Sequence, residues 1–225
     1  MNKIGSLNEQ PLHASLKEWY AGADGRVEVL IDGFIVDVFK DGFIIEIQTG
    51  NFSSIKSKLI RLSSDYNLKL VYPIAAEKWL LKHPKDDMGE ITKRKSPKKG
   101  CRAQIFTELV SFPELLCSKR FSLEIAMIKE QELRMFTGEK PWRNQGWVTV
   151  ERQLIEVVET ATYHKPTELS ALMPSGLPQY FTTNDIASTG SMPRWLAQKM
   201  AYCLRNMGVI KQIGKKGRSN LYALI

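Results

Sequence analysis

Three acidic side chains fall into one row of a predicted β-meander, where together they could hold a metal ion. The segment 26–50 contains three short β-type runs that are separated by two Asp-Gly pairs. An Asp-Gly pair between apolar runs is typical of a two-residue hairpin turn, and these turns place Glu28 opposite Asp37 and Asp37 opposite Glu46. Like charges directly opposite one another repel, whereas Mg²⁺ takes carboxylate oxygens at about 2.0–2.1 Å. The row therefore predicts a site for Mg²⁺ or Mn²⁺, and it predicts that neutralising Asp37 or Glu46 stabilises the metal-free protein.

The register of the meander decides whether this row exists. The first turn pairs Ile31 with Phe34 and the second pairs Lys40 with Phe43. A slip by one residue would move every side chain to the other face. The alternative interpretation is the solvated face of a half-buried antiparallel sheet. Against this alternative, the same row also holds apolar side chains, those of Ile35, Phe39 and Ile44.

Elements on both sides of the meander must hold these acids in place. Apolar spacing, capping residues and β-branched runs indicate their order along the chain. The expected elements are a helix over 12–20, a helix from Ser53 or Ser54 to about Leu62, a buried strand over 68–74, a helical turn over 75–81, a helix over 104–109 and a strand over 121–127. The three histidines show no HExxH-like spacing, so zinc is not expected.

The order helix, meander, helix, strand, with Asp37 on the second strand and Glu46-Ile47-Gln48 on the third, resembles the PD-(D/E)XK nuclease superfamily over about residues 10–82. The longer run EIQTGNFSSIKSKLIRL…LVYPIAAEKW also resembles an uncharacterised bacterial nuclease-like family. The resemblance implies an α/β core like that of restriction endonucleases, a mixed sheet with flanking helices. It also implies that Asp37, Glu46 and the carbonyl of Ile47 hold the metal, with Glu28 as an extra ligand or the anchor of a second ion.

Two features of this resemblance leave alternatives open. Glu18 on the first helix resembles an acid that resolvase-like members use near the metal, and the alternative is a surface glutamate. The lysine of the family's motif is Gln48 here. Gln48 could hydrogen-bond a water, as in some restriction enzymes of the superfamily; Lys56 or Lys58 on the next helix could supply the positive charge instead; or activity is lost.

The net charge of +8 is unevenly placed and indicates a polyanionic partner. Residues 1–88 carry 11 Lys/Arg against 12 Asp/Glu, which is −1, and residues 89–225 carry 21 against 12, which is +9. The densest basic run lies within 93–102, and we interpret it as a loop that either is solvated or contacts phosphates. The candidate phosphate contacts in this run are Lys93, Arg94, Lys95, Lys98 and Lys99.

The segment 181–225 resembles a winged helix-turn-helix. Thr182 or Thr183 caps a first short helix, and a second helix runs from Pro193 to Met207 before Gly208. A basic hairpin follows. Residues 183–225 hold seven Lys/Arg and one acid, which favours nucleic acid over the alternative of a protein-interaction module. The expected base-reading residues are Arg194, Gln198, Tyr202 and Arg205, and the expected phosphate contacts of the wing are Lys215, Lys216 and Arg218.

Together these patterns predict an α/β nuclease-like domain over 1–130, a linker over 131–165 and a winged helix domain over 166–225. The expected function is hydrolysis of DNA phosphodiester bonds by a metal-dependent nuclease. The alternative is a catalytically inactive nuclease-fold protein that acts as a DNA-binding regulator or adaptor. Charge alone does not exclude RNA. No signal peptide or long apolar run is present, so we expect a cytoplasmic protein without a membrane partner, and a homodimer if both DNA strands are cut.

Overall fold

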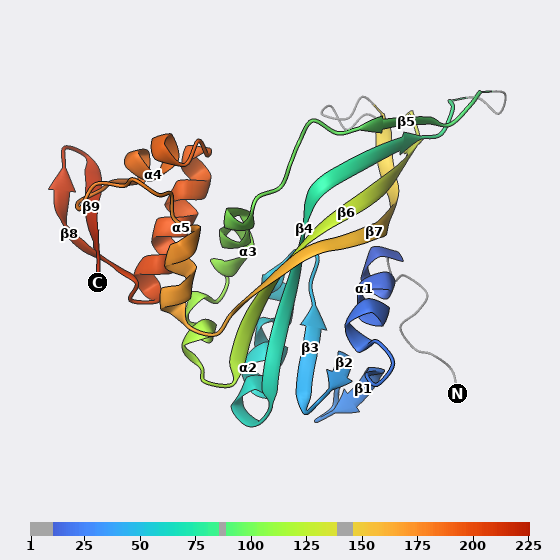
Figure 1. Cartoon of the computed structure of the whole chain (residues 1–225), viewed down its shortest axis with the longest axis horizontal. Helices are drawn as coiled ribbons and strands as arrows, with labels where there is room; N and C mark the ends of the chain where they lie inside the picture. The colour runs from blue at the N-terminus through green and yellow to red at the C-terminus, as the bar shows by residue number, and fades with distance from the viewer. Residues whose placement is uncertain (1–10, 86–88, 139–145) are drawn as a thin grey trace.

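The protein is a mixed α/β structure in which one large sheet is flanked by helices and followed by a helical segment with a small hairpin (Figure 1). The computed structural model describes residues 11–85, 89–138 and 146–225. The helices are α1 (Pro11–Ala21), α2 (Lys56–Asp65), α3 (Phe106–Leu109), α4 (Thr183–Thr189) and α5 (Arg194–Asn206), with 3₁₀ segments η2 (Phe52–Ile55), η3 (Arg102–Ile105), η4 (Pro113–Cys117) and η5 (Pro166–Leu172). The strands are β1 (Arg26–Ile31), β2 (Phe34–Lys40), β3 (Phe43–Ile47), β4 (Asn67–Lys82), β5 (Thr92–Lys95), β6 (Phe121–Phe136), β7 (Trp147–Tyr163), β8 (Ile210–Lys216) and β9 (Ser219–Leu224).

The large sheet has the order β1-β2-β3-β4-β6-β7, and β5 pairs with β4. The predicted meander and both of its turn registers are confirmed, because Ile31 pairs with Phe34 and Lys40 pairs with Phe43. Both residues of each Asp-Gly turn have positive φ, which is the geometry that a type I′ hairpin requires. β3 then runs parallel to β4, and β4 parallel to β6, so the sheet is mixed.

Two hydrophobic clusters cover the two faces of the sheet. On one face, Leu12 and Leu16 of α1 pack against Ile45 and Ile47 of β3. On the other face, the larger cluster joins strands, α2 and α3 to the buried side of α5. Along α1 and α2, the amphipathic spacing buries one stripe of each helix against the sheet and leaves charged side chains in water. The acid-bearing strands β2 and β3 are therefore held from both sides.

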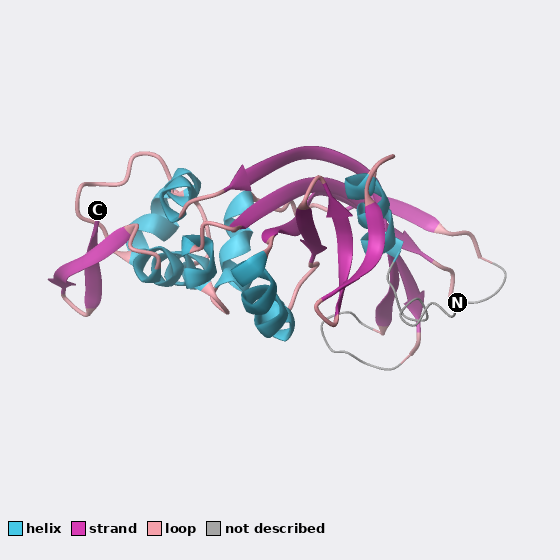
Figure 2. Cartoon of the chain, turned by 90° about the horizontal axis from the view of Figure 1, so that it is seen from below, coloured by secondary structure: helices cyan, strands magenta, loops and turns pink. Residues whose placement is uncertain are grey.

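The long strands correct two sequence-based predictions. Residues 75–81, expected to form a helical turn, continue β4, because they pair with β6 on one side and partly with β5 on the other. This long-range pairing overrides the helix propensity of Ala, Glu, Lys and Leu. The segment 131–165, expected to be a linker, completes β6 and forms β7, apart from 139–145, which lie outside the described residues. The strands curve along the molecule in Figure 2.

The C-terminal segment consists of α4, a turn, α5 and the hairpin of β8 and β9 (Figure 1). Thr182 caps α4, because its Oγ1 accepts a hydrogen bond from Asp185 N while Asp185 Oδ2 accepts from Thr182 N. Lys199 Nζ of α5 donates to the carbonyl of Thr107, 3.0 Å away, beside the contact of α5 with α3. Within the described part of the chain, no helix is long and apolar enough to cross a membrane.

Candidate functional site

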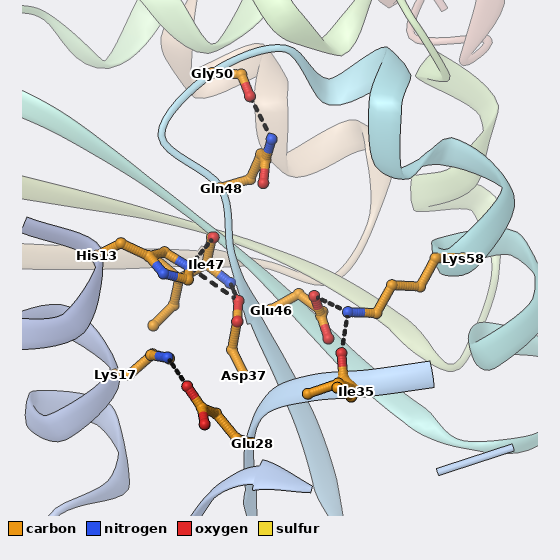
Figure 3. A network of polar contacts seen from close by, with 10 residues as sticks. All are labelled: His13, Lys17, Glu28, Ile35, Asp37, Glu46, Ile47, Gln48, Gly50 and Lys58. Carbon is orange, nitrogen blue, oxygen red and sulfur yellow. Dashed lines mark hydrogen bonds and ion pairs between the residues drawn. The ribbon is translucent and has the colours of Figure 1, made fainter. Parts of the chain in front are cut away.

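The candidate site lies where strands β2 and β3 separate. Their ladder runs from Lys40–Phe43 to Val38–Ile45 and ends there. Beyond that point, Ile47 N donates to Asp37 Oδ2 at 2.8 Å, so the carboxylate replaces the missing strand partner. His13 Nε2 of α1 lies 2.9 Å from the carbonyl oxygen of Ile47 and 3.2 Å from Asp37 Oδ2 (Figure 3). Because a carbonyl only accepts hydrogen bonds, we assign the proton to Nε2.

Glu46 occupies the other side of the split and is almost completely buried, with 5% of its side chain exposed. Lys58 Nζ of α2 donates to Glu46 Oε2 at 2.7 Å and to the carbonyl of Ile35 at 2.6 Å (Figure 3). The other carboxylate oxygen, Oε1, has no hydrogen-bond partner among the described residues. A buried polar atom without a protein partner is unusual, and strain, a bound water or a bound ion can account for it.

The surroundings move the pKa values of the two acids in opposite directions. Burial, and then the charge of Asp37, raise the pKa of Glu46 to about 7, although Lys58 counteracts this shift. Burial alone would raise the pKa of Asp37 as well. For Asp37, the interactions with His13, with Ile47 N and with Lys58 together outweigh burial. They hold the pKa of Asp37 below its usual value. Near neutral pH, Asp37 is ionised and Glu46 is near the midpoint of its titration.

Glu28, the third acid of the predicted row, is paired with a lysine of α1. The β1–β2 ladder passes from Val27–Val38 to Val29–Val36, and Glu28 has a left-handed backbone with φ of 53°. Its Oε1 accepts a hydrogen bond from Lys17 Nζ at 2.8 Å (Figure 3). In the described part of the chain, no three His, Cys, Asp or Glu side chains are grouped as metal ligands.

The side chains considered in place of the motif's missing lysine differ in their contacts with the two acids. Gln48 Nε2 donates to the carbonyl of Gly50 and is directed away from Asp37 and Glu46 (Figure 3). Lys56 is exposed, whereas Lys58 reaches Glu46. Glu18 is exposed on α1, and no hydrogen bond or ion pair joins it to either acid within the described residues. Of these side chains, Lys58 is the one that places a positive charge beside Glu46.

Sequence reasoning missed His13 and Lys17 as parts of this site. Their spacing of four residues places both on one flank of α1, which a periodicity argument could have noted. Their partners lie far along the chain, 24 residues away for Asp37 and 11 for Glu28. Sequence gives no signal for contacts of this kind.

The donor set fits a hard divalent cation. Oxygens of Asp37, Glu46 and the Ile47 carbonyl are the ligand types that Mg²⁺ and Mn²⁺ prefer. The partnerless Oε1 of Glu46 is the observation that supports the fit. His13 contacts Asp37 Oδ2 and the Ile47 carbonyl, and Lys58 contacts Glu46 Oε2, so an ion bound through these oxygens would require them to give up or share those contacts.

The predicted base-reading residues of α5 do lie together. They line a groove of about 260 Å³ between α5 and the start of β9. The spacing of four, four and three residues places them on one outer face of α5, while Leu196, Met200 and Leu204 face inward. The groove is lined by Arg194, Gln198, Tyr202 and Arg205 together with Arg218 and neighbouring residues of β9. Lys215 and Lys216 are exposed on β8 beside it.

The basic run expected to be a loop is in part a strand. Lys93, Arg94 and Lys95 form most of β5, because they pair with the end of β4. Lys95 forms an ion pair with Glu77, and Lys93 Nζ lies 5.1 Å from the ring centre of Trp79. The remaining two residues, Lys98 and Lys99, follow β5 and line a separate pocket.

Fold and site together define a mixed α/β protein with a buried and a half-buried acid at a strand split and a basic helix–hairpin segment. The chain belongs to the family described as a domain of unknown function, DUF8091, whose model matches residues 10–164 and so ends directly after β7. An uncharacterised protein of Treponema pallidum (strain Nichols) is 30% identical over 220 residues, which cover 97% of this chain and 86% of that protein. No solved structure matches.

Proposed function

We propose that this protein is a metal-dependent nuclease that hydrolyses DNA phosphodiester bonds. In this proposal, the core is of the PD-(D/E)XK type and residues 166–225 form a winged helix that binds DNA. The observation that carries the proposal is the convergence of Asp37, the carbonyl of Ile47 and the buried Glu46 at the split between β2 and β3. Oε1 of Glu46 has no hydrogen-bond partner in the described part of the chain, so this atom is available to bind a metal ion.

The chain's own residues have separate roles in this proposal. Asp37, Glu46 and the Ile47 carbonyl would hold Mg²⁺ or Mn²⁺, which neutralises phosphoryl oxygens and lowers the pKa of an attacking water. Lys58 provides the positive charge that the family takes from the position of Gln48. His13 orients the Asp37 carboxylate and the Ile47 carbonyl through its Nε2–H.

The basic groove of α5 supports DNA as the partner. Arg194, Arg205 and Arg218 line it together with the polar side chains of Gln198 and Tyr202, a set that suits both phosphates and base edges. These side chains make no ion pair within the described residues, so their charge is available to an anionic partner.

Incubation of the purified protein with Mg²⁺ or Mn²⁺ and a substrate panel tests the proposal. The panel contains linear, circular, single-stranded and branched DNA, with single-stranded RNA as a further arm. We expect cleavage of at least one DNA substrate and none in chelator. If nothing in the panel is cut, or if Asp37→Ala cuts as well as the parent, the nuclease proposal fails.

A second candidate is a DNA-binding regulator or adaptor that has kept the nuclease fold and lost catalysis. The specific observation in its favour is that His13 and Lys58 hydrogen-bond several of the oxygens that would bind an ion, while Gln48 is directed away. Calorimetric titration with Mg²⁺ and Mn²⁺ separates the two. A regulator would bind DNA tightly and take up neither ion at millimolar concentrations.

A homodimer, expected if one site per chain cuts each strand, is checked by light scattering.

A further inference from the structure

A second polar pocket, of about 220 Å³, lies beyond the end of β3, where the chain after β5 crosses β4. Its lining is strongly basic. Four cationic side chains and one carboxylate contribute to it, together with neutral hydrogen-bonding groups. The charged residues are Lys78, Lys98, Lys99 and Arg152 against Glu130, and the neutral donors include Thr49 and Gln104.

The segment that carries Lys98 and Lys99 is fixed against β4. Ser96 N donates to the carbonyl of Lys78 at 2.8 Å, and Gly100 N donates to the carbonyl of Ala75 at 2.8 Å. A Cβ on Gly100 would lie 2.7 Å from that carbonyl oxygen, so only glycine permits this close approach. The two lysines are therefore held at the pocket by hydrogen bonds on both sides of them.

The other two cations are positioned by a completely buried acid. Glu130 has 0% of its side chain exposed. Its Oε1 lies 2.8 Å from Lys78 Nζ, and its Oε2 accepts hydrogen bonds from Arg152 Nη2 at 2.6 Å and Nε at 3.1 Å. Lys78 Nζ also contacts Glu132 Oε2 at 2.9 Å. About 30% of each cationic side chain is exposed, 28% for Lys78 and 30% for Arg152, so each can reach a ligand while it stays paired.

We propose that this pocket binds a phosphate group. Lys78 and Arg152 are paired with buried acids, whereas Lys98 and Lys99 make no ion pair within the described residues and leave the lining positively charged. Fixed guanidinium and ammonium donors beside neutral donors suit a phosphoryl group. The phosphate belongs either to the backbone of a nucleic acid or to the end of a strand. The assignment to a nucleic acid rests on the proposed nuclease function, whereas phosphate binding itself does not.

The position of the pocket relative to Asp37 and Glu46 supports the assignment of this phosphate to a nucleic acid. Thr49 lines the pocket and follows Glu46 by three residues, so their Cα atoms are at most about 11 Å apart. Ile74 also lines the pocket and belongs to the core cluster on the face that α2 covers, the face from which Lys58 reaches Glu46. At a rise of about 3.4 Å per nucleotide, this upper limit corresponds to at most about three nucleotides. The pocket would therefore hold a phosphate close to the bond that is cut.

Binding of inorganic phosphate to the full chain in chelator tests the site directly, by calorimetry or ³¹P NMR. Lys98→Ala with Lys99→Ala removes two exposed cations, and Gln104→Glu adds a negative charge to the pocket with little change of shape. Lys119→Ala with Lys165→Ala removes two exposed lysines that do not line the pocket and serves as the control. We expect saturable binding by the parent and the control, weakened more than about tenfold in both pocket variants. Absence of saturable binding in the parent, or equal loss in the control, overturns the proposal.

Two DNA duplexes of one sequence, with 5′-hydroxyl or 5′-phosphate ends, then identify the source of the phosphate. Binding is measured in chelator over a range of salt concentrations, so the result does not depend on cleavage. We expect the Lys98/Lys99 variant to lose affinity for both duplexes and about two units of salt slope, which indicates a backbone phosphate. Loss confined to the 5′-phosphorylated duplex indicates a strand end and also supports the pocket. Unchanged binding of both duplexes overturns the assignment to nucleic acid.

Discussion

The strand split that holds Asp37 and Glu46 and the groove along α5 carry their charges in opposite ways. At the split, each acid is largely buried and has a hydrogen-bonding partner on a helix, His13 of α1 for Asp37 and Lys58 of α2 for Glu46. At the groove, the side chains of Arg194 and Arg205 are exposed and of one sign. A buried, hydrogen-bonded cluster with an unsatisfied oxygen suits a specific small ligand. An exposed cluster of one sign suits an extended polyanion.

The two regions also differ in the contacts that assemble them. The groove residues come from one helix and the adjoining hairpin, so a periodic sequence is enough to assemble them. The split is assembled by contacts between α1, β2, β3 and α2, which tertiary packing must bring together. Substitutions at the split should therefore change activity and stability together, whereas substitutions at the groove should change binding alone.

The largest effect is expected from the acids of the split. Asp37→Ala or Glu46→Ala should reduce cleavage by at least about a hundredfold, or about 3 kcal/mol, because each removes a carboxylate that would hold the ion. Initial rates with Mg²⁺ and Mn²⁺ on the substrate that is cut measure the loss. Glu114→Ala is the matched control, since it removes an exposed acid of η4, outside the split. Equal losses in all three variants would mean that net charge, and not the split, controls the rate.

The two acids should differ in their effect on stability, contrary to the prediction from sequence that both behave alike. Asp37→Asn should lower the free energy of unfolding by about 1.5–3 kcal/mol, because it removes charge-assisted hydrogen bonds from His13 and Ile47 N. Glu46→Gln should raise it by about 1–2 kcal/mol at pH 8 in chelator, because ionised Glu46 is disfavoured by burial and by Asp37. Chemical denaturation measures both changes. A loss of stability in both variants would show that Glu46 is mainly a structural partner of Lys58.

The pH dependence of stability follows from the same shifts. The pKa of Glu46 is raised to about 7 in the folded protein, so its contribution is present at low pH and is lost as the pH rises from about 4.5 to about 7. The pKa of Asp37 is lowered, so its contribution is present above its usual pKa and is lost as the pH falls below it. Denaturation of the metal-free protein from pH 4 to 8 should therefore show a decline toward pH 7 that Glu46→Gln abolishes. Persistence of that decline in the variant would assign it to another group.

The sequence predicted local features well and long-range ones poorly. Both hairpin registers followed from the Asp-Gly pairs, and the cap of α4 from Thr182, because these signals lie within a few residues of their effects. The strand character of 75–81 and 131–165 could not be predicted, since it depends on pairing with distant strands. For the site, the acids and Lys58 were among the predicted residues, but His13 was not, because only the packing of α1 on the sheet brings it to Ile47.

At the groove, substitutions in the hairpin and in α5 should change DNA affinity in different ways. Lys215→Ala with Lys216→Ala should weaken binding to every DNA sequence and reduce the salt slope by about two units, because each lysine releases counterions from a phosphate. Gln198→Ala should cost about 1–3 kcal/mol on a preferred sequence and little elsewhere. Fluorescence anisotropy over a salt series measures both. If the lysine pair leaves affinity and slope unchanged, the hairpin does not contact DNA.

The smallest expected changes in stability concern the residues at the starts of α4 and α2. Thr182 is buried and caps α4 through Asp185 N, so Thr182→Ala should lower the free energy of unfolding by about 1 kcal/mol. Ser53, predicted from sequence as one cap of the helix after the meander, is exposed and donates to Asn51 Oδ1, and α2 begins after Ile55 without a side-chain cap. Ser53→Ala should therefore change stability by less than about 0.5 kcal/mol. Thermal denaturation of both variants measures the difference, and a larger loss for Ser53→Ala would show that the loop after β3 supports the split more than its contacts indicate.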